Sequence, residues 1–406
     1  MAATQQAKPN SQQATSRPNT PRITSRVYIL ELISLGYQFR INECDDSLEV
    51  NGVPITDPLR SRIRRDMRDK GYNRHLQAME DAYLAHAMEN SYHPIKAYLD
   101  SLKWDGYGHI DDLATYFTDI HARQATSCGD EPVFKIFFRR WIVGAVAKVL
   151  AAKQNAMFVL DGAQGIGKSH FVRWLASGVP SRYFIEKAIN PEDKDDDVRL
   201  INKWIWEVPE LGATTKRADH EAIKHFISKM EVTVRKPYGH YDVHKAAMAS
   251  MIGTINNEVG FLNDATGNRR FLVCTLEDIN KEYSQKIDVN QVWAEAVALY
   301  KSGGETEFLT QEETELQTCL NDTYMVDDPM LTGLVEKLKA NPDDNDPDHW
   351  ASSVTILSAL GYTQPRKADT MILAAAAKKV GLTKYKKNGV WGYYGVIISH
   401  NSKYAP

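Results

Sequence analysis

Residues 161–170 read D-G-A-Q-G-I-G-K-S-H, and residues 162–169 match the phosphate-binding pattern G-x-x-x-x-G-K-[ST] at every fixed position. The apolar run at 157–160 has the length of a strand, and residues 170–175 continue as a helix with an apolar face. Strand, glycine loop and helix therefore follow one another in the order that a nucleotide-binding loop requires.

The residue types of this loop predict their own roles. Gly162, Gly165 and Gly167 let backbone N–H groups turn toward an anion, and the following helix adds the partial positive charge of its N-terminus. Lys168 is then expected to reach the β- and γ-phosphates, and the hydroxyl of Ser169 to bind Mg²⁺. The motif predicts ATP and Mg²⁺ as cofactors.

Composition limits what the rest of the chain can be. The formal net charge of -3 over 406 residues excludes a uniformly basic surface, so any contact with nucleic acid needs a local basic patch. The four cysteines form no C-x-x-C pair, which argues against structural zinc and favours a reducing cytoplasm. The most apolar stretch, residues 133–150, contains four basic residues, so no membrane partner is expected.

Changes in composition and periodicity predict an α/β protein with five segments. The strands expected between 157 and 275 alternate with helices, which predicts a mostly parallel sheet flanked by helices. The boundaries are a disordered tail at 1–26, a mostly helical N-terminal or oligomerisation domain at 27–152, a nucleotide-binding core at 153–276, a helical extension and linker at 277–348, and a small C-terminal domain at 349–406. The tail has four basic residues and no acidic one, so it either touches nucleic acid or is a solvated leader.

The C-terminal segment pairs two short helices with a hairpin around Lys387-Asn388-Gly389. This order resembles a winged helix, a DNA-binding form. The segment is also basic, through Arg366, Lys367, Lys378, Lys379, Lys384, Lys386 and Lys387. A small packing or protein-docking domain remains the alternative.

A carboxylate-bearing strand follows the glycine loop in the chain. Hydrolysis of ATP needs a positioned metal and a polarised water, and carboxylates at a strand end supply both. The apolar stretch K-W-I-W-E-V-P-E-L at 203–211 places Glu207 and Glu210 at or just past such an end. We predict that they hold metal and orient water, the alternative being ordinary packing beside an exposed glutamate.

Two further segments carry groups that could contact the γ-phosphate. The strand at 251–257 ends on two amides, of which Asn256 is the candidate for holding phosphate oxygen and attacking water, although Asn-Asn also forms simple turns. Arg269 and Arg270 lie just before another strand. A guanidinium supplied from a neighbouring subunit would couple hydrolysis to assembly, whereas surface arginines without a role are common.

Residues 231–245 are predicted to form a basic hairpin with Pro237 and Gly239 at its tip. Basic side chains bind phosphates and aromatic rings pack on bases, which favours single-stranded nucleic acid as the partner. The candidates for contact are Lys236, Tyr238, His240 and Lys245. A solvated turn is the alternative.

The order of these segments resembles the superfamily III helicases of the AAA+ class, and more closely the virulence-associated protein E group of phages, satellites and genomic islands. The matching segments are 162–169, 204–211, 223–241, 252–257 and 261–271, with 94–106 resembling the lead-in. The pairing of R-K-P-Y-G-H with F-L-N-D-A-T-G-N-R-R-F is far more specific than the glycine loop alone. The resemblance covers roughly residues 90–275.

The resemblance implies a fold and a role for each matching residue. It implies an AAA+ P-loop core, nucleotide and Mg²⁺ contacts at Lys168 and Ser169, an acidic motif at Glu207 and Glu210, a sensor at Asn256, an arginine finger at Arg270 ahead of Arg269, and a channel-facing hairpin at Lys236, Tyr238 and His240. Relatives often have adjacent acidic residues, whereas Val208-Pro209 separates this pair. Which carboxylate holds the metal therefore stays open.

The reading that follows is an ATP-dependent DNA helicase that acts during replication of a phage or mobile element. We expect a homo-oligomeric ring, of six subunits, with ATP at subunit boundaries and single-stranded or forked DNA in the middle; the resemblance implies 3′ to 5′ polarity. The region before the core lacks clustered carboxylates for nucleotidyl transfer, so a separate primase is expected. The alternatives are an origin-melting initiator that binds a specific DNA site, and a small-molecule kinase whose turnover ignores DNA.

Overall fold

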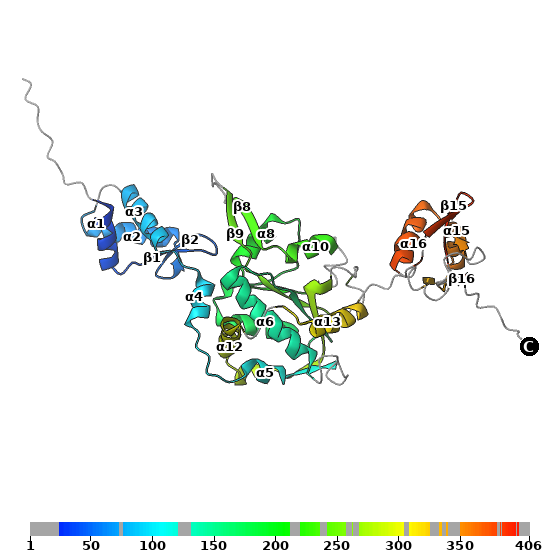
Figure 1. Cartoon of the computed structure of the whole chain (residues 1–406). Helices are drawn as coiled ribbons and strands as arrows, with labels where there is room; N and C mark the ends of the chain where they lie inside the picture. Colours follow the sequence, from blue (N-terminus) through cyan, green and yellow to red (C-terminus); the bar gives the residue numbers. More distant parts are fainter. Residues whose placement is uncertain are drawn as a thin grey trace, which may run out of the picture. The chain divides into compact units, whose positions relative to one another are not determined.

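The computed structural model separates into two compact units, residues 1–102 and 103–406. It describes residues 24–72, 76–120, 131–211, 220–235, 242–256, 262, 268–303, 308–324, 333–334, 338–339, 350–379, 382, 384–394 and 396–397 (Figure 1). No helix in these ranges is long and apolar enough to cross a membrane. Residues 1–23 of the predicted tail and residues 340–349, at the end of the predicted helical extension and linker, lie outside the described residues.

In the described residues of the N-terminal unit, four helices combine with a three-stranded antiparallel sheet of order β1-β2-β3. Its elements are α1 (Ser25–Ser34), β1 (Phe39–Asn42), β2 (Ser47–Val50), β3 (Val53–Pro54), α2 (Asp57–Asp69), α3 (Leu76–Glu89) and α4 (Pro94–Ser101). Asn51 and Gly52 have φ of 54° and 79° and join β2 to β3 in a hairpin. Phe39 stacks on Tyr83 with ring centroids 4.7 Å apart and ties the sheet to α3.

A six-stranded sheet organises the second unit. Its order is β4-β11-β5-β10-β7-β6, and every strand runs parallel to its neighbours except β4, which is antiparallel to β11. The strands are β4 (Phe117–Asp119), β5 (Met157–Gly162), β6 (Phe184–Glu186), β7 (Ile205–Val208), β10 (Ser250–Thr254) and β11 (Phe271–Ile279). The predicted mostly parallel sheet is confirmed.

Helices cover both faces of this sheet, which is why its strands are apolar throughout rather than alternating. The helices of this part are α5 (His109–Ala114), α6 (Val133–Ala151), α7 (Lys168–Leu175), α8 (Lys194–Asn202), α10 (His220–Ile227), α11 (Tyr283–Lys286), α12 (Val289–Ser302) and α13 (Gln311–Thr323). Helix α6 packs against β5 and β11 on one side and against α12 on the other. It is therefore buried almost all around.

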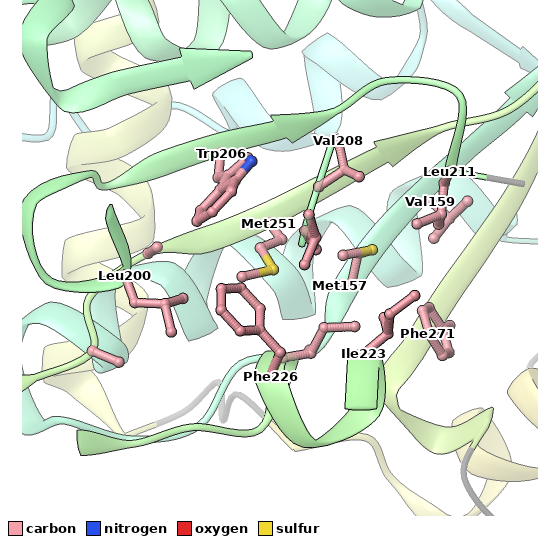
Figure 2. Packing of buried hydrophobic residues seen from close by; sticks show 14 of the residues in the cluster. Met157, Val159, Leu200, Trp206, Val208, Leu211, Ile223, Phe226, Met251 and Phe271 are labelled. Carbon is pink, nitrogen blue, oxygen red and sulfur yellow. The ribbon is translucent and has the colours of Figure 1, made fainter. Parts of the chain in front are cut away.

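Side chains of β5 alternate between the two faces. Phe158 lies 5.7 Å from the ring of Phe134 on α6, whereas Met157 and Val159 enter the cluster on the opposite face. Figure 2 shows that cluster, in which Phe226 of α10 points at Trp206 of β7. Their rings meet edge to face at 5.8 Å. Trp206 thus faces α10, which leaves its neighbour Glu207 on the α7 side of the sheet.

The edge strands were not expected from the sequence. This region lies in the segment predicted as mostly helical, but α5 ends at Ala114, and Phe117–Asp119 form β4 against β11. Stacking of Phe117 on Phe134 at 3.8 Å holds this short strand, which is a tertiary contact that local periodicity cannot report. The predicted domain boundary at 152 differs from the division after Leu102, because β4 and α6 pack with the sheet.

The described residues between 350 and 394 form a small antiparallel sheet of order β13-β15-β14 with two helices. Its elements are β13 (Trp350–Ser352), α15 (Ser353–Ala359), α16 (Lys367–Lys379), β14 (Lys384–Lys387) and β15 (Val390–Tyr394). The predicted hairpin is present, because Asn388 and Gly389 have the positive φ angles of a turn, 50° and 83°. The two helices predicted beside it are α15 and α16. A Cβ on Gly392 would collide with the Ala351 carbonyl oxygen, which explains the glycine.

The described residues contain two further pairs of strands. They are β8 (Glu231–Arg235) with β9 (Asp242–Ala246), and β12 (Leu338–Lys339) with β16 (Val396–Ile397).

Candidate functional site

A pocket of about 380 Å³ opens where the central strands end. Parallel strands bring their carboxyl ends to one edge, so residues that follow β5, β7 and β10 meet there. The lining residues are Gln164, Gly165, Gly167, Lys168, Ser169, His170, Pro209, Glu210, Thr254, Asn256 and Lys281. The glycine loop, the carboxylate strand and the amide-tipped strand are therefore brought together as the sequence predicted.

The glycine loop has a backbone that only glycine adopts easily. Gly162, Gly165 and Gly167 have φ of 146°, 86° and 117°. A Cβ on Gly162 would collide with the Leu276 carbonyl oxygen, and one on Gly167 would lie 2.9 Å from Cε of Lys281. The loop leads into α7, whose N-terminal N–H groups are available to an anion.

Lys168 is the most constrained cation of the pocket. Only 6 % of the residue is exposed, and its Nζ donates to the carbonyl oxygens of Gly162 at 2.7 Å and Ala163 at 2.9 Å, and to Oδ1 of Asn256 at 3.1 Å. Burial lowers the pKa of the ammonium, and Asp161 opposes that effect. Two predicted residues, Lys168 and Asn256, are thus in direct contact across neighbouring strands.

Glu207 is a buried carboxylate without a normal hydrogen bond. The residue is 0 % exposed, and neither of its carboxylate oxygens has a partner of normal geometry among the described residues. Burial raises the pKa of the carboxyl, although the nearby Ser169 hydroxyl and the Arg173 guanidinium lower it. Because a divalent cation would satisfy both oxygens, the pairing of Glu207 with Ser169 fits Mg²⁺.

Glu210 has a different position from Glu207. It is exposed, lines the pocket and has a left-handed backbone with φ of 48°, immediately after Pro209. This conformation costs a non-glycine residue on the order of 1–2 kcal/mol. One carboxylate is therefore held inside the sheet and the other at the pocket surface, where water has access.

The two predicted arginines lie on a 3₁₀ turn, Asn268–Arg270, that leads into β11. Arg270 is half-buried and its Nε donates to Oγ of Ser228 at 2.5 Å. Arg269 is exposed, and its side chain makes no hydrogen bond or ion pair within the described ranges. Neither arginine lines the pocket of its own chain.

Helix α13 fixes the backbone of this arginine turn. Gln317 donates from Nε2 to the carbonyl oxygens of Arg269 at 3.1 Å and Phe271 at 2.8 Å. One turn later, Asn321 donates from Nδ2 to the carbonyl oxygens of Asn268 at 2.9 Å and Phe271 at 3.1 Å. Both amide side chains are 2 % exposed, so these bonds are shielded from water.

The residue after α13 reaches the glycine loop itself. Tyr324 donates its hydroxyl to Oδ2 of Asp161 at 2.7 Å and shares a hydrogen bond with Thr275. Oδ1 of Asp161 accepts from the backbone N–H of Gly162 at 2.8 Å. Burial raises the pKa of Tyr324, so the hydroxyl stays protonated and remains a donor. One helix end therefore connects the arginine turn with the start of the loop.

Sequence reasoning missed Asp161, Tyr324 and Lys281 as parts of this site. Tyr324 and Asp161 are 163 residues apart in the chain, and no local pattern marks their pairing. The signal for Asp161 was available, because it is the last polar residue of an apolar strand directly before the motif.

The predicted basic hairpin is described only in its stem. Strands β8 and β9 pair antiparallel, with Val232 opposite Lys245, so the predicted strand-turn-strand form is present. Lys245 is half-buried on β9. Lys236, Tyr238 and His240 lie outside the described residues, and their predicted contact with DNA stays a prediction.

Comparisons with known proteins give a family and a fold. The family model of the virulence-associated protein E-like domain matches residues 99–326. The chain is similar to a solved structure described as "The A form apo structure of NrS-1 C terminal region-CTR", with 13 % identity, coverage of 93 % of this chain and 100 % of that chain, and a TM-score of 0.50. A second structure of that region, residues 305–718, has 13 % identity, coverage of 92 % and 100 %, and a TM-score of 0.48. No curated protein matches. At this identity, the first structural likeness shows the mixed α/β fold alone.

Proposed function

Because this chain belongs to the virulence-associated protein E-like family, we propose that it is an Mg²⁺-dependent ATPase that unwinds DNA during replication of a phage or other mobile element. One observation carries the proposal. Buried Lys168 contacts Asn256 at the carboxyl edge of a parallel sheet, beside a buried carboxylate that lacks a normal partner. This combination of a cation, an amide and a carboxylate around a glycine loop is what phosphoryl transfer requires.

Each group has a task that its surroundings favour. The N–H groups of the loop and α7 bind phosphate oxygens, and Lys168 exchanges its loop carbonyl partners for the β- and γ-phosphates. Ser169 and Glu207 are the residues that would hold Mg²⁺, which neutralises phosphate charge when bound. Glu210 at the pocket surface accepts a proton from the attacking water, and Asn256 orients that water. This assignment follows the difference in burial between the two glutamates.

We further propose that a neighbouring chain completes the pocket. Arg269 and Arg270 directly precede β11 in the chain, but they do not line the pocket of their own chain. This position supports a role at a subunit boundary. A heterologous contact forms a ring when the rotation between neighbours closes, and we propose a closed ring of six subunits. Hydrolysis at each boundary then moves the hairpins at 236–240 along single-stranded DNA.

The test is the mass of the assembly with a non-hydrolysable ATP analogue, with and without forked DNA. We expect a ring with the analogue, and hydrolysis that increases when the fork is added. Lys236→Ala with His240→Ala should keep basal hydrolysis and lose both stimulation by DNA and unwinding. A solitary chain that hydrolyses ATP at the same rate with and without DNA would contradict the proposal.

A further inference from the structure

The C-terminal part of this acidic protein is strongly basic. Residues 350–397 contain seven basic residues and one acidic residue, Asp369, which is a formal charge of +6. The whole chain carries -3. Such a local reversal of sign attracts a polyanion, since the potential of clustered like charges extends over several ångströms of solvent.

The charge is displayed around an exposed tryptophan. Trp391 on β15 is 51 % exposed, and the ammonium groups of Lys384 and Lys386 lie 4.9 Å and 5.6 Å from its ring centroid. Neither lysine forms an ion pair with a carboxylate in the described part of the chain. The charge of both ammonium groups is therefore available to an anionic ligand, and the contact with the ring limits the positions that they occupy.

The strand register explains this arrangement. Lys386 lies directly opposite Trp391, and Lys384 lies opposite Tyr393, the next residue on the same face of the hairpin. The other face carries a second aromatic group, since Tyr385 is 48 % exposed with its ring 5.3 Å from that of Tyr394. One face of this short hairpin thus carries two lysines around one exposed ring, and the other face carries a second exposed ring.

We infer that the β14–β15 hairpin is a binding surface for single-stranded nucleic acid. Lys384 and Lys386 contact phosphates, and Trp391 stacks on an unpaired base. The charge fits any polyanion, but a half-exposed ring between two lysines fits an unpaired base best, because a duplex keeps its base faces stacked inside. An acidic protein segment would use the lysines and leave the ring without a role.

The experiment measures binding of a fluorescent 20-nucleotide oligo-dT to the full chain by anisotropy, without nucleotide. The chain carries Lys236→Ala and His240→Ala, so that the other proposed DNA contact does not mask this one. Trp391→Ala should weaken binding about 5- to 100-fold, the range for loss of one stacked base. Lys384→Ala with Lys386→Ala should reduce the slope of log affinity against log salt by about 1.4, since each phosphate contact to a single strand contributes about 0.7.

Matched controls keep the result interpretable. Lys103→Ala with Lys286→Ala removes two exposed lysines elsewhere and should leave affinity and slope unchanged. Trp391→Phe keeps a ring and should retain most of the binding that Trp391→Ala loses. Circular dichroism shows whether each variant is folded.

Three outcomes would overturn the inference. They are unchanged oligo-dT affinity in both the tryptophan and the lysine variants, tighter binding of a duplex of equal charge than of oligo-dT, and equal competition by a poly-glutamate peptide. The last two would assign the surface to duplex DNA or to an acidic protein. Since no ATP is present, none of these results depends on the proposed hydrolysis.

Discussion

Two regions of this protein use lysine in opposite ways. Lys168 is 6 % exposed and holds three fixed hydrogen bonds in the pocket, whereas Lys384 and Lys386 lie exposed over a tryptophan ring on the C-terminal hairpin. A buried cation is selective for a ligand of matching geometry and is little affected by salt. Exposed cations act at longer range and lose their effect as salt screens them. The difference in burial therefore distinguishes the pocket, where we propose hydrolysis, from the C-terminal hairpin, where we propose binding of nucleic acid.

The largest effect should come from removing the buried cation. Lys168→Ala should lower kcat for ATP about 100-fold or more, because a preorganised charge in a water-poor site is lost. The fold should persist, since the ammonium bonds mainly to loop carbonyls. Steady-state turnover and circular dichroism measure the two. Lys286→Ala is the matched control. Turnover of Lys168→Ala near the wild-type rate would mean that the buried lysine has no role in hydrolysis that the exposed lysines lack.

The next largest effect should come from neutralising the buried carboxylate of Glu207, which should lower kcat and raise the stability of the fold. Glu207→Gln should lower kcat about 100-fold, because the amide lacks the charge that would hold Mg²⁺. It should also raise the free energy of unfolding by about 1–3 kcal/mol, because an unpaired carboxylate costs more to bury than a neutral amide. Burial raises the pKa of Glu207 in the folded state, so the native state binds the proton more tightly than the unfolded state. Stability from this group is therefore present at low pH and lost as pH rises through the folded pKa.

Urea unfolding of the wild type and Glu207→Gln at pH 5 and pH 8 measures that difference. The stabilisation by Gln should be larger at pH 8 than at pH 5. Glu210→Gln is the control, because Glu210 is exposed and its substitution removes no buried charge. Equal behaviour of the two variants would mean that burial does not distinguish the carboxylates.

The smallest effect should come from the hydroxyl that links α13 to the glycine loop. Tyr324→Phe removes the donor to Asp161 and should destabilise the fold by about 1 kcal/mol. We expect KM for ATP to rise a few-fold with a smaller change in kcat, because Asp161 no longer fixes Gly162 as firmly. Thermal unfolding and steady-state kinetics measure both, with Tyr107→Phe at an exposed site as control. Unchanged kinetics and stability would make the link incidental.

The same comparison explains how far the sequence could predict the structure. The glycine loop, its strand and its helix are local patterns, so their prediction was confirmed, as was the resemblance to the virulence-associated protein E group. The meeting of Lys168 with Asn256 needed only the rule that parallel strands end at one edge. The hairpin at Asn388-Gly389 was equally local, because both residues must adopt positive φ.

Contacts between distant segments could not be predicted in this way. Strand β4 exists because Phe117 stacks on Phe134, and the arginine turn is fixed by amides of α13 roughly fifty residues later. The sequence around Gln317 or Tyr324 contains no pattern that predicts these partners. The roles of Glu207, Glu210, Arg269 and Arg270 in hydrolysis stay predictions for the same reason, because they depend on what meets the pocket from outside the chain.

The shared pocket is tested most directly by mixing two inactive variants. One chain carries Lys168→Ala, and the other carries Arg269→Ala with Arg270→Ala. Each alone should hydrolyse ATP poorly, but an equal mixture should recover about a quarter of wild-type turnover, because that share of boundaries pairs an intact loop with intact arginines. Full turnover by the arginine variant alone, or a mixture no more active than its separate components, would contradict the account.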